Sequence, residues 1–240
     1  MLVRLIREHK ADAFVVAEKA YDNILDTLYK EYLAKSMVSH EGSESQFIQP
    51  IWLDIGGHVG SSSIKIHRRG ASRIYTFEPE PFNFALLSKN TAYYDDIVPL
   101  NYAIVGPNNL EQFILYGNLG TNSGRHTLAP GLSDTHSVTR LPIKALQFSY
   151  VMNMTNAKCA KIDVEGAEHT FFDELLASQL EFVMMEYHCD DAARDGFIDY
   201  MNVYTAENIA IKKGWDFRII ERDDKYKTFI VVMTKHASLL

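Results

Sequence analysis

From residue 51 onward, apolar residues follow two different periodicities along this chain. Short unbroken apolar runs indicate buried strands, and apolar residues spaced three and four apart indicate helices. We expect strands at 51–55, 73–77, 98–104, 111–116, 158–163 and 181–187. We expect helices after Gly60, after Pro81, ending within 173–180, and over 200–213. Alternating strands and helices predict a largely parallel sheet with helices on its faces.

The two ends of the chain depart from this alternation. Residues 1–48 combine helical apolar spacing with a polar stretch before Pro50, which predicts a helical N-terminal extension ahead of a core domain over 49–240. Near the C-terminus, two β-rich runs at 215–221 and 226–235 flank a short polar turn and predict a hairpin. We therefore expect an α/β fold whose mostly parallel sheet is closed by a C-terminal antiparallel hairpin.

Composition narrows the classes of function. Hydrophobic residues make up 47% of the chain and charged residues 23%, as in ordinary globular proteins. A net charge of −7 argues against nucleic-acid binding through a broad basic face. Cys159 and Cys189 suit neither a zinc site nor a disulfide framework, so we expect reduced thiols and a cytoplasmic protein. We expect no signal peptide and no membrane span, because charges interrupt the apolar N-terminus and no apolar run is long enough.

The first expected strand runs into a glycine-rich turn that has the spacing of a cofactor loop. Asp54 is followed by Gly56, Gly57 and Gly60, and a helix is expected to begin directly after them. Glycine lets the backbone approach a ligand closely. The spacing Asp-x-Gly-x-x-x-Gly differs from the Gly-x-Gly-x-x-Gly of NAD enzymes and is typical of loops that hold S-adenosylmethionine, whose ammonium group suits a carboxylate. The alternative is a tight strand-to-helix turn that is rich in glycine for structural reasons.

An acidic residue ends the second expected strand. Glu78 follows the apolar run 73–77 and precedes Pro79. Ligands of open α/β sheets bind at the carboxyl ends of the strands, where a carboxylate can accept hydrogen bonds from both ribose hydroxyls. A solvated acid at a strand end is the structural alternative. Together with the glycine loop, Glu78 favours a cofactor that carries a nucleoside.

Two later strand ends carry clustered ionisable groups. The stretch Lys161–Glu168 has the sequence KIDVEGAE, in which Asp163 and Glu165 are expected on one face and Glu168 is expected to open the next helix. These acids could serve a cofactor amine, a metal ion or a substrate hydroxyl, or they could cap a helix. On the next strand, His188 is two residues beyond Glu186, so both should open on the same cleft. His188 suits a general base near neutral pH, and a histidine bonded within the structure is the alternative.

These motifs resemble the three signatures of the FkbM-type S-adenosylmethionine-dependent methyltransferases. The matching segments are Leu53–Gly60, Phe77–Pro79 and Lys161–Glu168, and Val183–His188 resembles the strand that follows in the family. The resemblance covers residues 50–235 and implies a Rossmann-like class I methyltransferase fold with a seven-stranded sheet. It also implies methyl transfer to a hydroxyl oxygen of a sugar or another small molecule. His58 departs from the family loop, which commonly has Asn or a small residue there.

The resemblance and the chemistry of the motifs assign the candidate site. The expected cofactor-binding residues are Asp54, Gly56, Gly57, Gly60, Glu78 and Asp163. The expected catalytic residues are Asp163, Glu165 and His188. The clustered carboxylates are compatible with a divalent metal, but the sequence requires none. The expected partner is a small hydroxylated acceptor.

Two alternatives stay open at this point. An NAD-linked oxidoreductase uses the same combination of strand, glycine loop and acidic residue, although the loop spacing and the terminal hairpin count against it. A catalytically silent S-adenosylmethionine-binding module would keep the fold without turnover. The sequence indicates neither the identity of the acceptor nor the oligomeric state, and the polar stretch 117–137 is a long loop of the kind that often has a function.

Overall fold

The computed structural model describes residues 26–27, 29–34, 49–107, 113–117, 139–189, 201–223 and 228–235. The chain divides into two compact units, Met1–Phe47 and Ile48–Leu240. In the first unit, the described residues 26–27 and 29–34 are helical. The rest of the expected N-terminal extension, and nearly all of the expected loop 117–137, lie outside the described residues.

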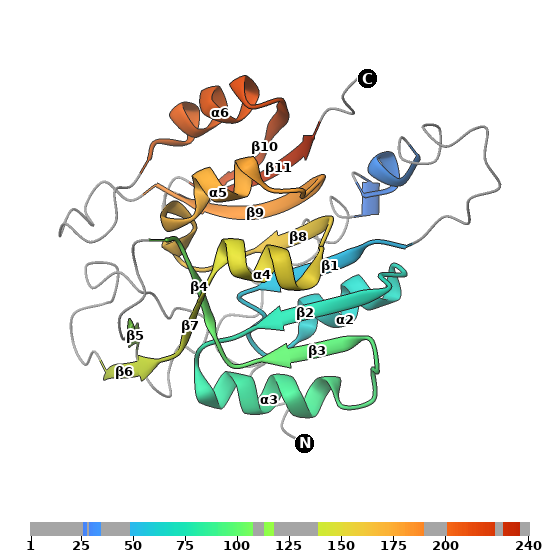
Figure 1. The fold of residues 1–240 in the computed structure, drawn as a ribbon, viewed down its shortest axis with the longest axis vertical. Coiled ribbons are helices and arrows are strands. Elements are labelled where there is room, and N and C mark those ends of the chain that lie inside the picture. Colours follow the sequence, from blue (N-terminus) through green and yellow to red (C-terminus); the bar gives the residue numbers. More distant parts are fainter. Residues whose placement is uncertain are drawn as a thin grey trace. The chain divides into compact units, whose positions relative to one another are not determined.

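The second unit is built on a seven-stranded sheet with the order β10-β11-β9-β8-β1-β2-β3 (Figure 1). Its strands are β1 (Ile51–Ile55), β2 (Arg73–Phe77), β3 (Ile97–Leu100), β8 (Cys159–Ile162), β9 (Phe182–His188), β10 (Trp215–Asp223) and β11 (Thr228–Lys235). Only β11 runs antiparallel, and it pairs with β9 on one side and β10 on the other. The expected α/β fold with a C-terminal antiparallel hairpin is therefore confirmed.

Helices cover both faces of this sheet. They are α2 (Ser61–Arg68), α3 (Pro81–Thr91), α4 (Phe148–Thr155), α5 (Phe172–Ala177), α6 (Val203–Lys212) and the 3₁₀ helix η3 (Ala167–Thr170). Figure 1 shows α4 and α5 in front of the sheet and α2 behind it. The start of α3 follows from its sequence, because Pro81 fits the first helical position and the Glu80 side chain accepts a hydrogen bond from the Asn83 N–H at 2.6 Å. None of the described helices combines the length and the apolar character needed to cross a membrane.

The structure corrects several expected elements. The single strand expected over 98–104 is wrong: the chain turns after Leu100, where the Tyr102 N–H donates to the Leu100 carbonyl at 3.1 Å. β3 ends there, and β4 (Ala103–Val105) pairs instead with β7 (Ala145–Gln147). The strand expected over 111–116 is β5 (Phe113–Gly117), which pairs with β6 (Thr139–Ile143). The sequence pattern predicted none of β6, β7 and α4, and the helix expected to end within 173–180 is η3 followed by α5.

The strand register brings the candidate residues to one edge of the sheet. Ile55 pairs with Phe77 on one side and with Ile162 on the other, and Ile162 pairs with Met185. Ile55, Phe77 and Ile162 are the last residues of their strands. Because these strands are parallel, the residues that follow them lie at the same carboxyl edge, above a buried apolar core.

Candidate active site

The glycine loop after β1 is packed against protein on two sides. Gly56 has φ 85°, and a Cβ there would overlap the backbone carbonyl oxygen of Asp163. A Cβ on Gly57 would overlap the Thr76 side chain of β2. The N–H groups of both glycines donate to the Phe77 carbonyl at 2.9 Å. These two glycines are therefore required by the close approach of neighbouring strands, before any ligand is considered.

Asp54 is fully buried beneath this loop. Its Oδ2 accepts hydrogen bonds from the Ser62 and Ser63 hydroxyls, both at 2.6 Å, which ties β1 to the first turn of α2. Its Oδ1 lies 3.5 Å from the Lys161 Nζ. Lys161 in turn donates to the Gly56 carbonyl at 2.8 Å. Since a buried carboxylate needs a compensating charge, Lys161 holds both Asp54 and the loop in place.

Glu78 lies directly after β2 and is only 6% exposed. Its Oε2 accepts the His58 N–H and its Oε1 accepts the Glu80 N–H, both at 2.9 Å. His58 has a positive φ of 48°, so the residue that departs from the family loop turns its backbone toward this carboxylate. Burial raises the pKa of Glu78 to about 7, despite the two backbone hydrogen bonds. Backbone N–H groups thus hold Glu78 in place, and among the described residues no ion pair to it is formed.

Asp163 and Glu165 take different partners. β8 ends at Ile162, so the strand periodicity that would place both acids on one face does not extend to them. Asp163 Oδ2 lies 3.6 Å from the Lys161 Nζ, whereas Glu165 has a φ of 51° and its Oε2 lies 3.4 Å from the Nε2 of His188. Although burial opposes the charge on Lys161, Asp163 and Asp54 raise its pKa.

Glu168 and His188 form a buried pair between η3 and the end of β9. Glu168 is fully buried, and its Oε1 accepts the His188 N–H at 2.7 Å and lies 3.0 Å from the imidazole Nδ1. Its Oε2 accepts the Gly166 N–H at 2.9 Å. Burial alone would raise the pKa of Glu168, but the charge and hydrogen bonds of His188 lower it below the usual value. The same pairing raises the pKa of His188 well above its usual value, although burial opposes this.

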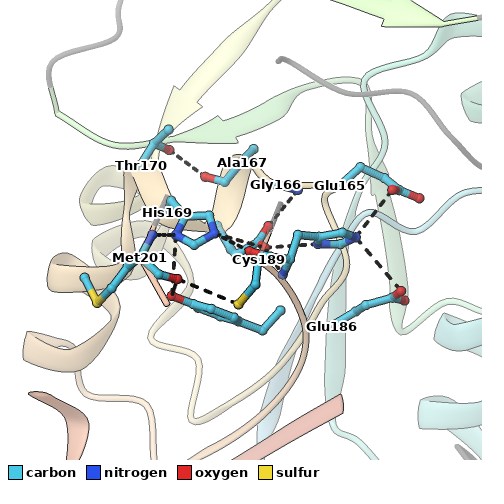
Figure 2. Close-up of polar contacts among 11 residues, drawn as sticks. Glu165, Gly166, Ala167, His169, Thr170, Glu186, Cys189 and Met201 are labelled. Atoms are coloured by element: carbon cyan, nitrogen blue, oxygen red, sulfur yellow. Dashed lines mark hydrogen bonds and ion pairs between the residues drawn. The ribbon is translucent and has the colours of Figure 1, made fainter. Parts of the chain in front are cut away.

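The other imidazole nitrogen of His188 faces two more carboxylates. Besides Glu165, the Glu186 Oε1 lies 3.9 Å from Nε2, as the two-residue spacing on β9 predicts. Figure 2 shows Glu165 and Glu186 on the side of this cluster away from His169. Both acids have side chains about 30% exposed. Burial, then the charge of Asp163, raises the pKa of Glu186 to about 8.

A set of hydrogen bonds that the sequence did not reveal fixes the end of β9. The His169 Nε2 lies 2.6 Å from the His188 carbonyl oxygen, and the His169 Nδ1 accepts the Met201 N–H at 3.2 Å. The Tyr187 hydroxyl donates to the Met201 carbonyl at 2.7 Å. Sequence reasoning counted Glu168 among the acids that could serve a ligand or cap a helix, did not assign it a site role, and missed His169. Its position beside Glu168 in the acidic motif was the one available signal.

The described residues contain no group of three or more His, Cys, Asp or Glu side chains that could hold a metal ion. The ionisable groups of the candidate site are therefore its carboxylates, Lys161 and His188. Asp54, Glu78 and the glycine loop lie at the ends of β1 and β2, and the Glu168–His188 pair lies at the ends of β8 and β9. The residue roles expected from the sequence remain predictions.

Comparison with known proteins decides the family. The model of the Methyltransferase FkbM domain matches residues 54–221. The chain belongs to this family. The match includes Glu78, the Lys161–Glu168 stretch and His188, so the resemblance expected from these motifs is confirmed. A comparison with curated protein sequences gives no significant match.

One solved structure supports this fold, and others align with the chain more weakly. Magnesium protoporphyrin IX methyltransferase from Synechocystis PCC 6803, solved with bound SAM, aligns with a TM-score of 0.50 at 9% identity over 95% of this chain and 86% of that chain. An rRNA methylase from Streptococcus thermophilus gives 0.46 at 9% identity over 87% and 94%. A Pyrococcus horikoshii protein described as a transferase gives 0.40 at 13% identity, and the alignment covers 79% of this chain and 58% of that longer protein. At these identities the similarity concerns the fold alone.

Proposed function

We propose that this protein uses S-adenosylmethionine to methylate a hydroxyl oxygen of a sugar or another small molecule. The FkbM family match supports methyl transfer, and the carboxyl edge of the sheet supports the assignment of residues. One observation supports an oxygen atom as the methyl acceptor: the Nε2 of the His188 imidazole faces the partly exposed Glu165 and Glu186. A hydroxyl needs to lose its proton on methylation, and this histidine is a proton acceptor beside groups that can bind hydroxyls.

The residues at the ends of β1 and β2 fit the cofactor. Each oxygen of Glu78 accepts one backbone N–H, which leaves a second lone pair on each for the ribose hydroxyls. Within the described part of the chain, the buried Asp54 Oδ1 has no hydrogen-bond partner. An amino group of the ligand, or a water bound to it, would complete the coordination of this oxygen. Asp163, held near Lys161, is proposed to help bind the cofactor and to orient the acceptor.

The chemistry divides between the bound cofactor and the chain. S-adenosylmethionine supplies a methyl group that its sulfonium already activates. The protein positions the acceptor oxygen in line with that methyl group and removes the hydroxyl proton. His188 accepts the proton at Nε2, with Glu165 beside it. Carboxylates of Asp163, Glu165 and Glu186 accept hydrogen bonds from other acceptor hydroxyls, which favours neutral polyols over anionic compounds.

Calorimetric titration with S-adenosylmethionine, S-adenosylhomocysteine and NAD tests the cofactor. We expect the two adenosyl compounds to bind and NAD to fail. Binding of NAD alone would overturn the proposal in favour of an oxidoreductase.

Turnover on a panel of hydroxylated acceptors, followed by S-adenosylhomocysteine release, tests the reaction. We expect Glu78→Ala to weaken cofactor binding and Asp163→Ala to slow methyl transfer. If the cofactor binds and no acceptor of any class is methylated, the protein is a silent binding module. If both variants keep the wild-type rate, the residue assignment is wrong.

A further inference from the structure

The Glu168–His188 pair has a geometry that a helix-capping acid does not require. Glu168 is fully buried and lies within hydrogen-bond distance of the imidazole Nδ1, while Nε2 points to the two acids that are partly exposed. A buried carboxylate is stable only when donors satisfy it. A proton on Nδ1 is such a donor, so the pair selects the tautomer in which Nδ1 carries the hydrogen.

We propose that Glu168 is a positioning residue that fixes the tautomer and the basicity of His188, so that the Nε2 lone pair faces the acceptor hydroxyl. This inference rests on the proposed function, in which His188 accepts the hydroxyl proton. Glu168 itself is fully buried and acts only through the imidazole. A carboxylate that orients a catalytic histidine in this way is a general arrangement in enzymes.

The proton and electron balance of the step is simple. The acceptor oxygen forms a bond to the methyl carbon as the sulfur–carbon bond breaks, and that electron pair stays on sulfur. The acceptor O–H bond breaks, and its proton forms a bond to the Nε2 of His188. The resulting imidazolium lies between Glu168 and Glu165 and returns the proton to solvent through the partly exposed Glu165.

The surroundings of His188 predict the direction of its pH response. Glu168 and His169 face it from η3, Glu165 from the turn before η3, and Glu186 from its own strand. Asp163 and Lys161 face Glu186 from β8 and its end. The negative charges outweigh the burial of the imidazole, so His188 holds its proton to higher pH than a free histidine. As a base it must lose that proton first, so kcat/KM should rise with pH through a midpoint above 6.5.

Glu168→Gln separates positioning from mere packing. If the amide oxygen of the new glutamine takes the place of Oε1, its amide NH₂ faces the Gly166 N–H. Both groups are hydrogen-bond donors, so the bond to Gly166 is lost. If the amide turns over, its nitrogen faces Nδ1 and selects the opposite tautomer. We expect the midpoint of the kcat/KM profile to fall by about one pH unit or more, and the plateau to fall roughly 100-fold or more, with little change in KM. Glu168→Asp restores the negative charge and should return the midpoint toward the wild-type value.

Nitrogen-15 NMR of histidine-labelled protein gives a readout that needs no acceptor. His188→Gln assigns the signals, and we expect the wild-type His188 to show protonated Nδ1 together with a raised midpoint. In Glu168→Gln the midpoint should fall and the tautomer signature should change. If His188→Gln and Glu168→Gln do not fold well enough for NMR, Glu168→Asp is titrated instead. A His188 titration midpoint near 6.5 in both the wild type and Glu168→Asp would overturn the inference.

Asp96→Asn is the matched control. It removes a carboxylate that lies 2.7 Å from the Nδ1 of another histidine, His67, outside the candidate site. We expect its kcat/KM profile to match the wild type. If Glu168→Gln lowers only the amount of folded protein, and the folded fraction keeps the wild-type profile and tautomer, then Glu168 is structural and the inference is wrong. Failure of the wild type to bind S-adenosylmethionine in calorimetry would instead overturn the proposed function.

Discussion

Glu78 and Glu168 are two buried glutamates at the same edge of the sheet, and their pKa values shift in opposite directions. Each accepts two backbone N–H groups, one on each carboxylate oxygen. Burial raises the pKa of Glu78 to about 7, whereas Glu168, which is more deeply buried, has a lowered pKa. The difference is the His188 imidazole: of these two glutamates, Glu168 contacts it and Glu78 does not.

This comparison separates two roles that the sequence alone could not distinguish. Backbone donors hold a buried carboxylate in place but do not offset the loss of its hydration, whereas a cationic partner does. Glu168 is satisfied within the protein, which suits a residue that positions another group. Each oxygen of Glu78 has a lone pair that accepts no hydrogen bond from the described backbone, and burial destabilises its charged form. Both properties suit a residue that gains hydrogen-bond donors when a ligand binds.

The largest expected effect concerns Gly56, which contacts the backbone at the ends of β2 and β8. Its N–H donates to Phe77, next to Glu78, and its α-carbon packs against the Asp163 carbonyl. Gly56→Ala adds a methyl group where backbone already lies, at a φ of 85° that side chains rarely adopt. We expect the free energy of unfolding to fall by about 3 kcal/mol or more, measured by urea denaturation.

Gly214→Ala is the control for this change. Gly214 has the same φ of 85°, but a Cβ there meets nothing within 4 Å. It should cost only about 1 kcal/mol, from backbone strain. Equal losses in the two variants would show that strain, and not the contact between β1 and the end of β8, makes Gly56 necessary.

Glu168→Gln should be the next most destabilising change. The change removes the buried carboxylate beside the charged imidazole and leaves the partly exposed Glu165 and Glu186 as its neighbouring acids. In addition, two backbone donors compete for one oxygen. We expect a loss of about 3 kcal/mol in the free energy of unfolding at pH 6, where His188 is charged. Asp96→Asn breaks a partly exposed pair and should lose less than about 1 kcal/mol. A loss no greater than that of Asp96→Asn would show that the imidazole does not stabilise Glu168.

Glu78→Gln should act on ligand binding more than on folding. Gln presents one acceptor where the carboxylate presents two, so one of the proposed ribose hydrogen bonds is lost. We expect the Kd for S-adenosylmethionine to rise between about 10- and 100-fold in calorimetry. Glu181→Gln, which changes an exposed ion pair with Lys158, serves as the control and should leave the Kd unchanged. An unchanged Kd in Glu78→Gln would contradict the role of this residue.

Much of the fold could be predicted because its strand ends are marked by strong local signals. β1 and β2 have the bounds expected from the sequence, since each apolar run ends at an acidic residue or a glycine turn. The break between β3 and β4 was not predicted, because Asn101 is a single polar residue within an otherwise apolar run. α4 was missed because its start carries no capping signal: the N-cap residue, Gln147, forms no side-chain capping bond.

The candidate site divides in the same way. The two-residue spacing on β9 correctly predicted that Glu186 and His188 lie on one face of the strand, because the local geometry of a strand determines this contact. The partner of Glu168 lies 20 residues away, a tertiary contact that no local pattern encodes. The glycines were expected to leave room for a ligand, and the structure shows that Gly56 and Gly57 first leave room for neighbouring backbone and side chain.

The smallest expected effect is a pH dependence that tests the raised pKa of Glu78 directly. Its pKa in the folded protein, about 7, lies above the ordinary value of 4.5, so the folded state binds this proton more tightly than the unfolded state. The free energy of unfolding therefore falls as pH rises from about 4.5 to 7 and then levels off.

Glu78→Gln is the control for other groups that titrate in this range. Glu186, up to about pH 8, and His188 also lower the free energy of unfolding as pH rises, but both are still present in Glu78→Gln. The difference between wild type and Glu78→Gln isolates Glu78, and urea denaturation at pH 5 and pH 8 should show the wild type losing about 2 kcal/mol more than the variant. Parallel losses would mean that the two backbone N–H groups alone compensate a buried carboxylate, and the contrast with Glu168 would then no longer depend on the imidazole.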